Sequence, residues 1–169
     1  RYDRSGSNAD IYRAYKMNPL AEPYDEEGNI RPAAWEDSSE AFAVNPLSDL
    51  NNKVNDIRAK VITNNVLEVQ LPFVPGLSYK LNTGYTYENS SWKKYQGMDT
   101  YYGARSNGIL NTDDWHSEEW ILENIISYVR DFGKHHLFIT GLYSAQSYMK
   151  EGNTMEGKNF PNDVMYYYQ

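Results

Sequence analysis

The residues most suited to acid–base or metal chemistry lie in one short acidic stretch. Asp113 and Asp114 precede His116, and Glu118 and Glu119 follow it. Paired carboxylates can act as general acid and base in sugar hydrolysis, and carboxylates beside an imidazole can bind a divalent cation. All five residues are close neighbours in sequence, whereas catalytic and metal sites usually combine residues of defined spacing. The pattern favours a solvated acidic loop, with a local cation site or a hydrolase centre as alternatives.

A second group of oxygen ligands occurs at Asp49, Asn51 and Asn52, but its spacing matches no EF-hand loop. The chain has no nucleophile-elbow, zinc-protease, phosphate-loop or dinucleotide-binding motif. It also has no cysteine, which excludes a disulfide framework, a thiolate metal site and a cysteine nucleophile. We therefore predict no catalytic residue, no metal site and no cofactor, and a protein that is not an enzyme.

Aromatic side chains are the other candidates for a binding role. Tyrosine accounts for 16 residues, and tyrosine and tryptophan are common at membrane interfaces and on binding surfaces. The segment 89–119 is a long excursion between strands, and such excursions are often functional. Its candidates for contact with a substrate or a covering partner are Trp92, Tyr95, Tyr101, Tyr102 and Trp115. The alternative is that these side chains pack on one another and order the segment.

Two stretches, Ile57–Glu88 and Trp120–Tyr148, are expected to form the hairpins that position these residues. In the first strand the odd positions are mostly apolar and the even positions carry the charges, which is the period of a β-strand. The second hairpin alternates less strictly. Val74–Leu77 and Asp131–Lys134 have the composition of tight turns.

The length of these strands separates two all-β architectures. Globular strands typically have about 5–6 residues, whereas a tilted membrane-spanning strand needs about 9–11. All four candidate strands reach the longer figure, and short turns alternate with long excursions, as in outer-membrane barrels. We therefore predict an all-β fold, a segment of an antiparallel transmembrane β-barrel. The alternative is a secreted β-sandwich that binds carbohydrate, with the apolar face buried against a second sheet.

Composition excludes several other classes of protein. The net charge of −7 and the isoelectric point near 4.9 argue against a nucleic-acid binder. The mean hydropathy is −0.76, and no apolar run approaches the ~20 residues of a spanning helix. The first residues do not resemble a signal peptide, and both ends fall inside unfinished patterns. We therefore expect a segment of a longer mature protein.

Eight short segments are spread over nearly the whole chain. They are YKMNPLA at 15–21, YDEEGN at 24–29, NPLSDLN at 45–51, PGLSYKLN at 75–82, WILENI at 120–125, FGKHH at 132–136, GLYSAQ at 141–146 and FPNDV at 160–164. In order and spacing, this series resembles the SusC/RagA family of TonB-linked outer-membrane proteins.

The resemblance implies a 22-stranded barrel, of which this chain would supply about four full strands. It also implies import of glycans or peptides across the Bacteroidetes outer membrane, powered by TonB and covered by a SusD-like surface lipoprotein. No segment resembles the family's plug domain, its TonB box or its closing C-terminal strand. Contact with TonB is therefore expected through regions other than these 169 residues.

In such a barrel, one face of the hairpins contacts outer-membrane lipid and the other lines the lumen, where charge is tolerated. The expected lumen-facing residues are Arg58, Lys60, Glu68, Lys80 and Glu123. The expected parts of the single barrel domain are an extracellular loop region at 1–52, a hairpin at 53–88, an extracellular loop at 89–119, a hairpin at 120–148, and a loop with the start of the next strand at 149–169.

Overall fold

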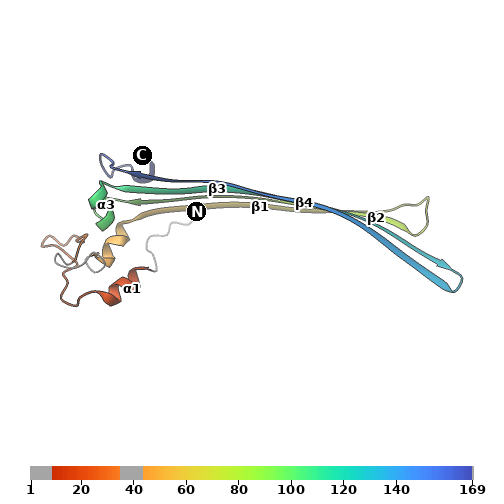
Figure 1. Ribbon diagram of the computed structural model, residues 1–169, viewed down its shortest axis with the longest axis horizontal. Coiled ribbons are helices and arrows are strands. Elements are labelled where there is room, and N and C mark those ends of the chain that lie inside the picture. The colour runs from red at the N-terminus through yellow and green to blue at the C-terminus, as the bar shows by residue number, and fades with distance from the viewer. Residues whose placement is uncertain (1–8, 35–43, 169) are drawn as a thin grey trace. The chain divides into compact units, whose positions relative to one another are not determined.

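The computed structural model describes residues 9–34 and 44–168, so expectations for residues 1–8, 35–43 and 169 lie outside the described residues. Four long β-strands dominate this part of the chain (Figure 1). In chain order the elements are α1 (Ala9–Lys16), η1 (Pro46–Asn51), β1 (Lys53–Gln70), β2 (Leu77–Gln96), α3 (Tyr101–Ser106), β3 (Ile109–Phe132), β4 (His135–Lys158) and η2 (Tyr166–Tyr168).

The strands form one sheet in the order β1-β2-β3-β4, with each strand paired to its neighbour in sequence. They contain 18, 20, 24 and 24 residues, well beyond the typical globular length of about 5–6. The predicted all-β, antiparallel architecture is therefore confirmed, and it is consistent with a segment of a β-barrel wall.

Contacts divide the chain into two compact units, which we describe separately. The first unit comprises Arg1–Arg58, Ser90–Asp114 and Asn153–Gln169, and the second comprises Ala59–Asn89 and Trp115–Gly152.

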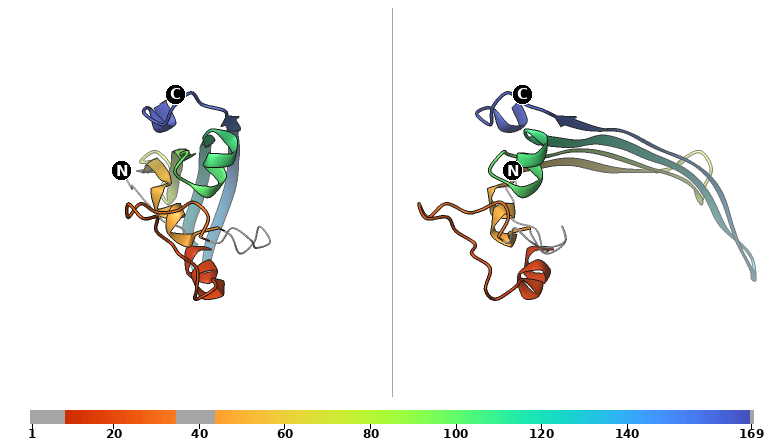
Figure 2. Two further views of the ribbon diagram at one scale, coloured as in Figure 1. Left: turned by 90° about the vertical axis from the view of Figure 1, so that its left-hand side faces the viewer. Right: turned by 60° about the vertical axis from the view of Figure 1, so that its left-hand side comes forward.

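The first unit contains all the helical elements of the described residues. Figure 2 shows η1 and α3 at the ends of the strands to which they are joined. Asn45 caps η1 by accepting a hydrogen bond from the Leu47 amide, and Thr100 caps α3 by accepting one from the Gly103 amide, which satisfies amides that lack partners within a helix. A small core surrounds Val44 and Tyr101, which are both buried.

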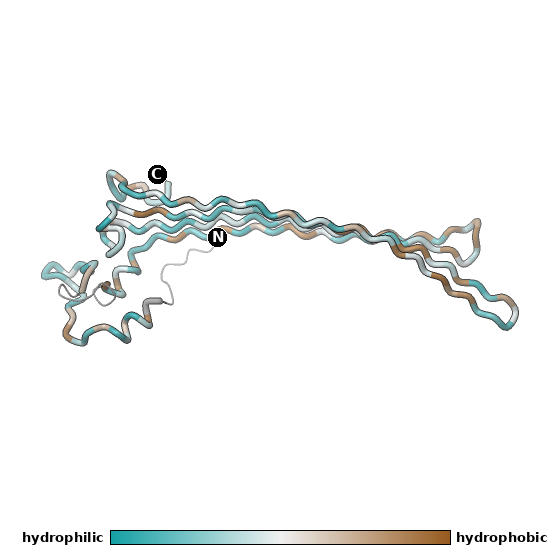
Figure 3. Tube along the Cα trace, viewed as in Figure 1, coloured by the Kyte–Doolittle hydropathy of each residue, from teal (hydrophilic) through white to brown (hydrophobic). Residues whose placement is uncertain are grey.

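The second unit consists of two hairpins with tight connections at residues 71–76 and 133–134. Apolar and hydrophilic residues are interspersed along its strands, as the hydropathy colouring in Figure 3 shows. Most of its side chains are exposed, including many large apolar ones. Among the described residues, no helix is long and apolar enough to cross a membrane.

The strands extend further than the sequence predicted. Residues 89–119 were expected to be a loop, but β2 continues to Gln96 and β3 begins at Ile109, so only residues 97–108 connect them. Likewise, β4 continues to Lys158, and residues 159–168 form a turn and η2 instead of starting another strand. Beyond the hairpins expected from the sequence, apolar and polar residues no longer alternate. The strands continue there because backbone hydrogen bonds between strands do not require alternation. Within the segment 1–52, which was expected to be a loop region, residues Ala9–Lys16 form the helix α1.

Candidate functional site

The faces of the second unit follow from its cross-strand contacts. Lys60 contacts Glu88, with 3.3 Å between Nζ and Oε2, and Asn82 donates to Glu123 Oε2 at 3.0 Å. Opposed side chains lie on the same face of a sheet, and the face alternates along each strand. Even positions of β1 and β2 therefore share one face with odd positions of β3. We call it the polar face.

The polar face includes four of the five residues expected to line a lumen. Lys60 and Glu68 are even positions of β1, Lys80 is an even position of β2, and Glu123 is an odd position of β3. Arg58 belongs to the first unit, where its Nε lies 3.4 Å from Asp56 Oδ1. The face also carries exposed apolar residues: Ile62, Val66, Phe138 and Leu142.

The opposite face of the second unit, which we call the apolar face, is rich in exposed hydrophobic side chains. Its large exposed members include Val61, Leu67, Tyr85, Trp120, Ile126, Ile139 and Tyr143. Leu67 and Tyr143 are 53% and 66% exposed. Contiguous exposed apolar surface of this kind marks an interaction with a protein or a membrane.

Four polar side chains of the apolar face are hydrogen-bonded in two pairs. The Tyr79 hydroxyl donates to Asn124 Oδ1 at 2.7 Å, and Asn65 Nδ2 donates to Thr83 Oγ1 at 3.5 Å. In hydrocarbon an unpaired polar group costs several kcal/mol, so internal pairing is what a lipid-facing surface requires.

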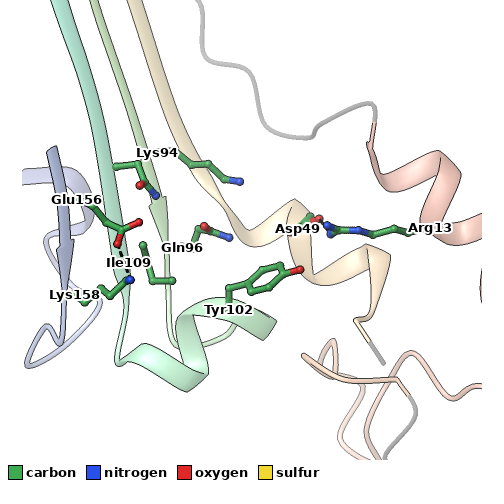
Figure 4. A pocket seen from close by; sticks show the side chains of 9 residues that line it. Arg13, Asp49, Lys94, Gln96, Tyr102, Ile109, Glu156 and Lys158 are labelled. Atoms are coloured by element: carbon green, nitrogen blue, oxygen red, sulfur yellow. Dashed lines mark hydrogen bonds and ion pairs between the residues drawn. The ribbon is translucent and has the colours of Figure 1, made fainter. Parts of the chain in front are cut away.

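The first unit contains an open pocket of about 420 Å³ (Figure 4). Its strand-borne lining comes from one face, because Lys94 and Gln96 are even positions of β2, and Glu156 and Lys158 are even positions of β4. The other lining residues are Ile109 and Asn111 of β3, Arg13 of α1, Asp49 of η1 and Tyr102 of α3.

Two ion pairs stand on opposite sides of the pocket. Arg13 donates to Asp49 Oδ2 at 3.0 Å, and its guanidinium carbon lies 5.9 Å from the centre of the Tyr102 ring. Lys158 Nζ lies 2.6 Å from Glu156 Oε1. Lys94 has no ion pair with any described carboxylate. The five ionic groups of the lining therefore carry a net charge of +1 when they are all ionised.

A partly buried cluster holds the end of β2 against the C-terminal segment, and we call it the Asp163 cluster. Tyr95 is 0% exposed; its hydroxyl donates to Asp163 Oδ1 at 2.7 Å, and the Met98 amide donates to Oδ2 at 2.7 Å. Phe160 and Tyr166 meet the Tyr95 ring edge-to-face, with centroids 5.6 and 6.1 Å away. The two hydrogen bonds and the stacked rings fix the residues that lead into α3.

Asp99 lies beside this cluster and has a perturbed acidity. Burial raises its pKa, and repulsion from Asp163 raises it further, although its own backbone amide and Lys53 act in the opposite direction. Desolvation, with a smaller contribution from Asp163, therefore favours the neutral form of Asp99 relative to a free side chain.

The five aromatic candidates are distributed over different environments. Tyr95 lies inside the Asp163 cluster, and Tyr101 is 5% exposed in the small core. Both rings are buried, and contact of Tyr95 and Tyr101 with a substrate or a covering partner stays a prediction. Tyr102 is 40% exposed beside the pocket. Trp92 is half-buried on β2, and Trp115 lies in the second unit with Lys150 Nζ 4.0 Å above its ring.

The acidic stretch forms no common site. His116 Nε2 lies 3.9 Å from Glu151 Oε2 in the second unit, whereas Asp113 Oδ1 accepts a hydrogen bond from Thr154 in the first. Consecutive strand residues point to opposite faces, which separates Asp113 from Asp114. In the part of the chain that the structure describes, no three acidic or histidine side chains are placed to hold a metal ion.

The pocket is not predictable from the sequence. Its lining residues come from six elements and are far apart in sequence. The one available signal was the pair of cations at Lys93 and Lys94, of which only Lys94 lines the pocket.

Comparison with known proteins gives one significant similarity. No family model matches the chain. The chain is 25% identical over 163 residues to TonB-dependent receptor P3 of Formosa agariphila, a match that covers 96% of this chain and 16% of that receptor. The chain resembles a segment of a TonB-dependent receptor. It spans about one sixth of the length of the relative that it matches.

Proposed function

We propose that the chain is part of the barrel wall of an outer-membrane, TonB-dependent importer of the SusC/RagA type. The observation that carries the proposal is the apolar face of the second unit, on which Asn65 is hydrogen-bonded to Thr83 and Tyr79 to Asn124. Strands of 18 to 24 residues support it, because a tilted spanning strand needs about 9–11. The similarity to a TonB-dependent receptor along nearly the whole chain supports it independently.

In this proposal the two faces of the second unit contact different media. The apolar face contacts outer-membrane lipid, and the polar face lines the lumen with Lys60, Glu68, Lys80 and Glu123. Charge in the lumen tunes which solutes pass, whereas charge on the lipid face is costly. Arg58 continues the same series of even positions on β1.

The cargo of the importer is a glycan or a peptide, and a SusD-like surface lipoprotein covers its extracellular opening. Of the five aromatic candidates for contact with cargo or cover, Tyr102, Trp92 and Trp115 are the ones that are not buried. TonB is engaged by parts of the full protein other than these 169 residues. The function is transport, and no residue of the chain is assigned a catalytic role.

The test is isolation of the natural protein from a membrane fraction with and without detergent, followed by measurement of its intact mass. We expect a chain far longer than 169 residues that stays dispersed only in detergent and retains a surface lipoprotein during mild purification. A detergent-independent species close to 19.6 kDa would contradict the proposal and favour the secreted carbohydrate-binding β-sandwich.

A further inference from the structure

The pocket of the first unit combines an unpaired cation with a flat aromatic wall. Lys94 and Gln96 extend from β2 into the space between the Arg13–Asp49 pair and the Glu156–Lys158 pair (Figure 4). We propose that this pocket binds a carboxylate-bearing saccharide. The interpretation of that saccharide as cargo rests on the proposed import function.

The ammonium group of Lys94 favours a ligand that carries a negatively charged group. Each carboxylate of the lining already has a cationic partner, at 3.0 Å for Asp49 and 2.6 Å for Glu156. A ligand carboxylate would therefore meet the ammonium of Lys94 without displacing either existing pair. Hydrogen bonds between ionised groups are roughly twice as strong as those between neutral ones.

The remaining lining favours a sugar as the carrier of that carboxylate. Tyr102 is 40% exposed, and an accessible aromatic ring offers an apolar face with a polar edge. The side-chain amides of Gln96 and Asn111, which also line the pocket, can both donate to and accept from sugar hydroxyls. The volume of about 420 Å³ lies within the range of small-molecule sites, about 300–1,000 Å³.

An acidic peptide offers the same charge but fewer hydroxyls to the two amides. The saccharide and the peptide are distinguished by direct comparison of three probes: tetragalacturonate, its neutral methyl ester, and tetraglutamate. Binding is measured by calorimetry on the full natural protein at low ionic strength, because exposed charge interactions weaken as salt increases.

The decisive variant is Lys94→Ala, and its matched control is Lys93→Ala. The two lysines are adjacent on β2 but point to opposite faces of the sheet. We expect Lys94→Ala to weaken tetragalacturonate binding by about 10- to 100-fold, as for other hydrogen bonds to charged groups. Lys93→Ala should leave the affinity unchanged, and Lys94→Arg should retain most of it.

The methyl ester should bind wild type and Lys94→Ala with the same weak affinity. Three results would each overturn the proposal. They are equal losses of affinity in Lys94→Ala and Lys93→Ala, equal affinity for tetragalacturonate and its methyl ester, and no binding of tetragalacturonate. Tighter binding of tetraglutamate would overturn the saccharide in favour of an acidic peptide. The assay needs no energised transport, so a protein that binds the acid without needing detergent would refute the importer and retain the pocket.

Discussion

Asn124 shows how a polar side chain is accommodated on an otherwise apolar surface. It lies among exposed hydrophobic residues, and its Oδ1 accepts a hydrogen bond from the Tyr79 hydroxyl at 2.7 Å on the neighbouring strand. If lipid covers this face, water cannot replace a lost partner. The hydrogen bond between Tyr79 and Asn124 should therefore contribute more to stability than a similar bond on a surface in contact with water.

Removal of the Tyr79 hydroxyl should show how strongly stability depends on this hydrogen bond. We expect Tyr79→Phe to lower the free energy of unfolding by about 1–3 kcal/mol, because the Asn124 carbonyl loses its partner in a nonpolar environment. The measurement is urea unfolding of the full protein folded into lipid vesicles.

Two controls separate the effect of losing the Tyr79–Asn124 hydrogen bond from the effect of removing a hydroxyl group. Tyr85→Phe removes a hydroxyl from the same face, where it has no hydrogen-bond partner among the described residues, and should have little effect. The double variant Tyr79→Phe/Asn124→Leu should recover most of the loss, since no polar group is left unpaired. A double variant as unstable as Tyr79→Phe alone would argue against a lipid-covered face.

At the scale of elements, the two hairpin connections contain glycines with different surroundings. Gly76 and Gly133 both adopt positive φ, at 87° and 61°. A Cβ at Gly76 would lie 1.9 Å from the Val129 carbonyl oxygen, whereas one at Gly133 would meet no atom within 4 Å. The Val129 amide also donates to the Gly76 carbonyl at 2.8 Å, which joins the first hairpin to β3.

Alanine at these positions should therefore have unequal effects. Both variants carry the strain of a left-handed conformation, about 1–2 kcal/mol. Gly76→Ala must also displace β3, which should add about 1–3 kcal/mol of destabilisation. Urea unfolding of the two variants measures the difference directly, and equal midpoints would show that β3 is not held at this distance.

The elements that could be predicted from sequence are those with one apolar face. Alternation identified both hairpins and their turns, because burial or lipid contact selects hydrophobic residues at every second position. It failed for residues 90–96, where serine and lysine occupy both faces of β2. The pocket was not predictable either, since only strand register brings Lys94 near Glu156 and Lys158.

At the scale of the whole molecule, the alternation of faces makes a prediction about membrane insertion. Leu67 belongs to the apolar face and Glu68 to the polar face of β1. Arginine on the lipid face of a barrel costs about 2–4 kcal/mol near the bilayer midplane. We therefore expect Leu67→Arg to block or strongly reduce assembly into the outer membrane, whereas Glu68→Arg is tolerated.

Heat-modifiable migration of the membrane-fraction protein in gel electrophoresis reports the assembled fraction of each variant. Equal loss in both variants would contradict the assignment of lipid and lumen to the two faces. Equal tolerance would contradict the membrane location itself.

The Asp163 cluster also has a consequence for the order of assembly. Tyr95 and Met98 depend on a carboxylate that lies 68 and 65 residues later in the chain, and contacts at such separations are slow to form. We therefore expect the Tyr95 hydroxyl and the Met98 amide to gain their partner only after β3 and β4 have aligned. A two-residue slip of β4 would shift that strand by about 7 Å, so we expect both hydrogen bonds to Asp163 to form only when the two later strands have paired in the correct register.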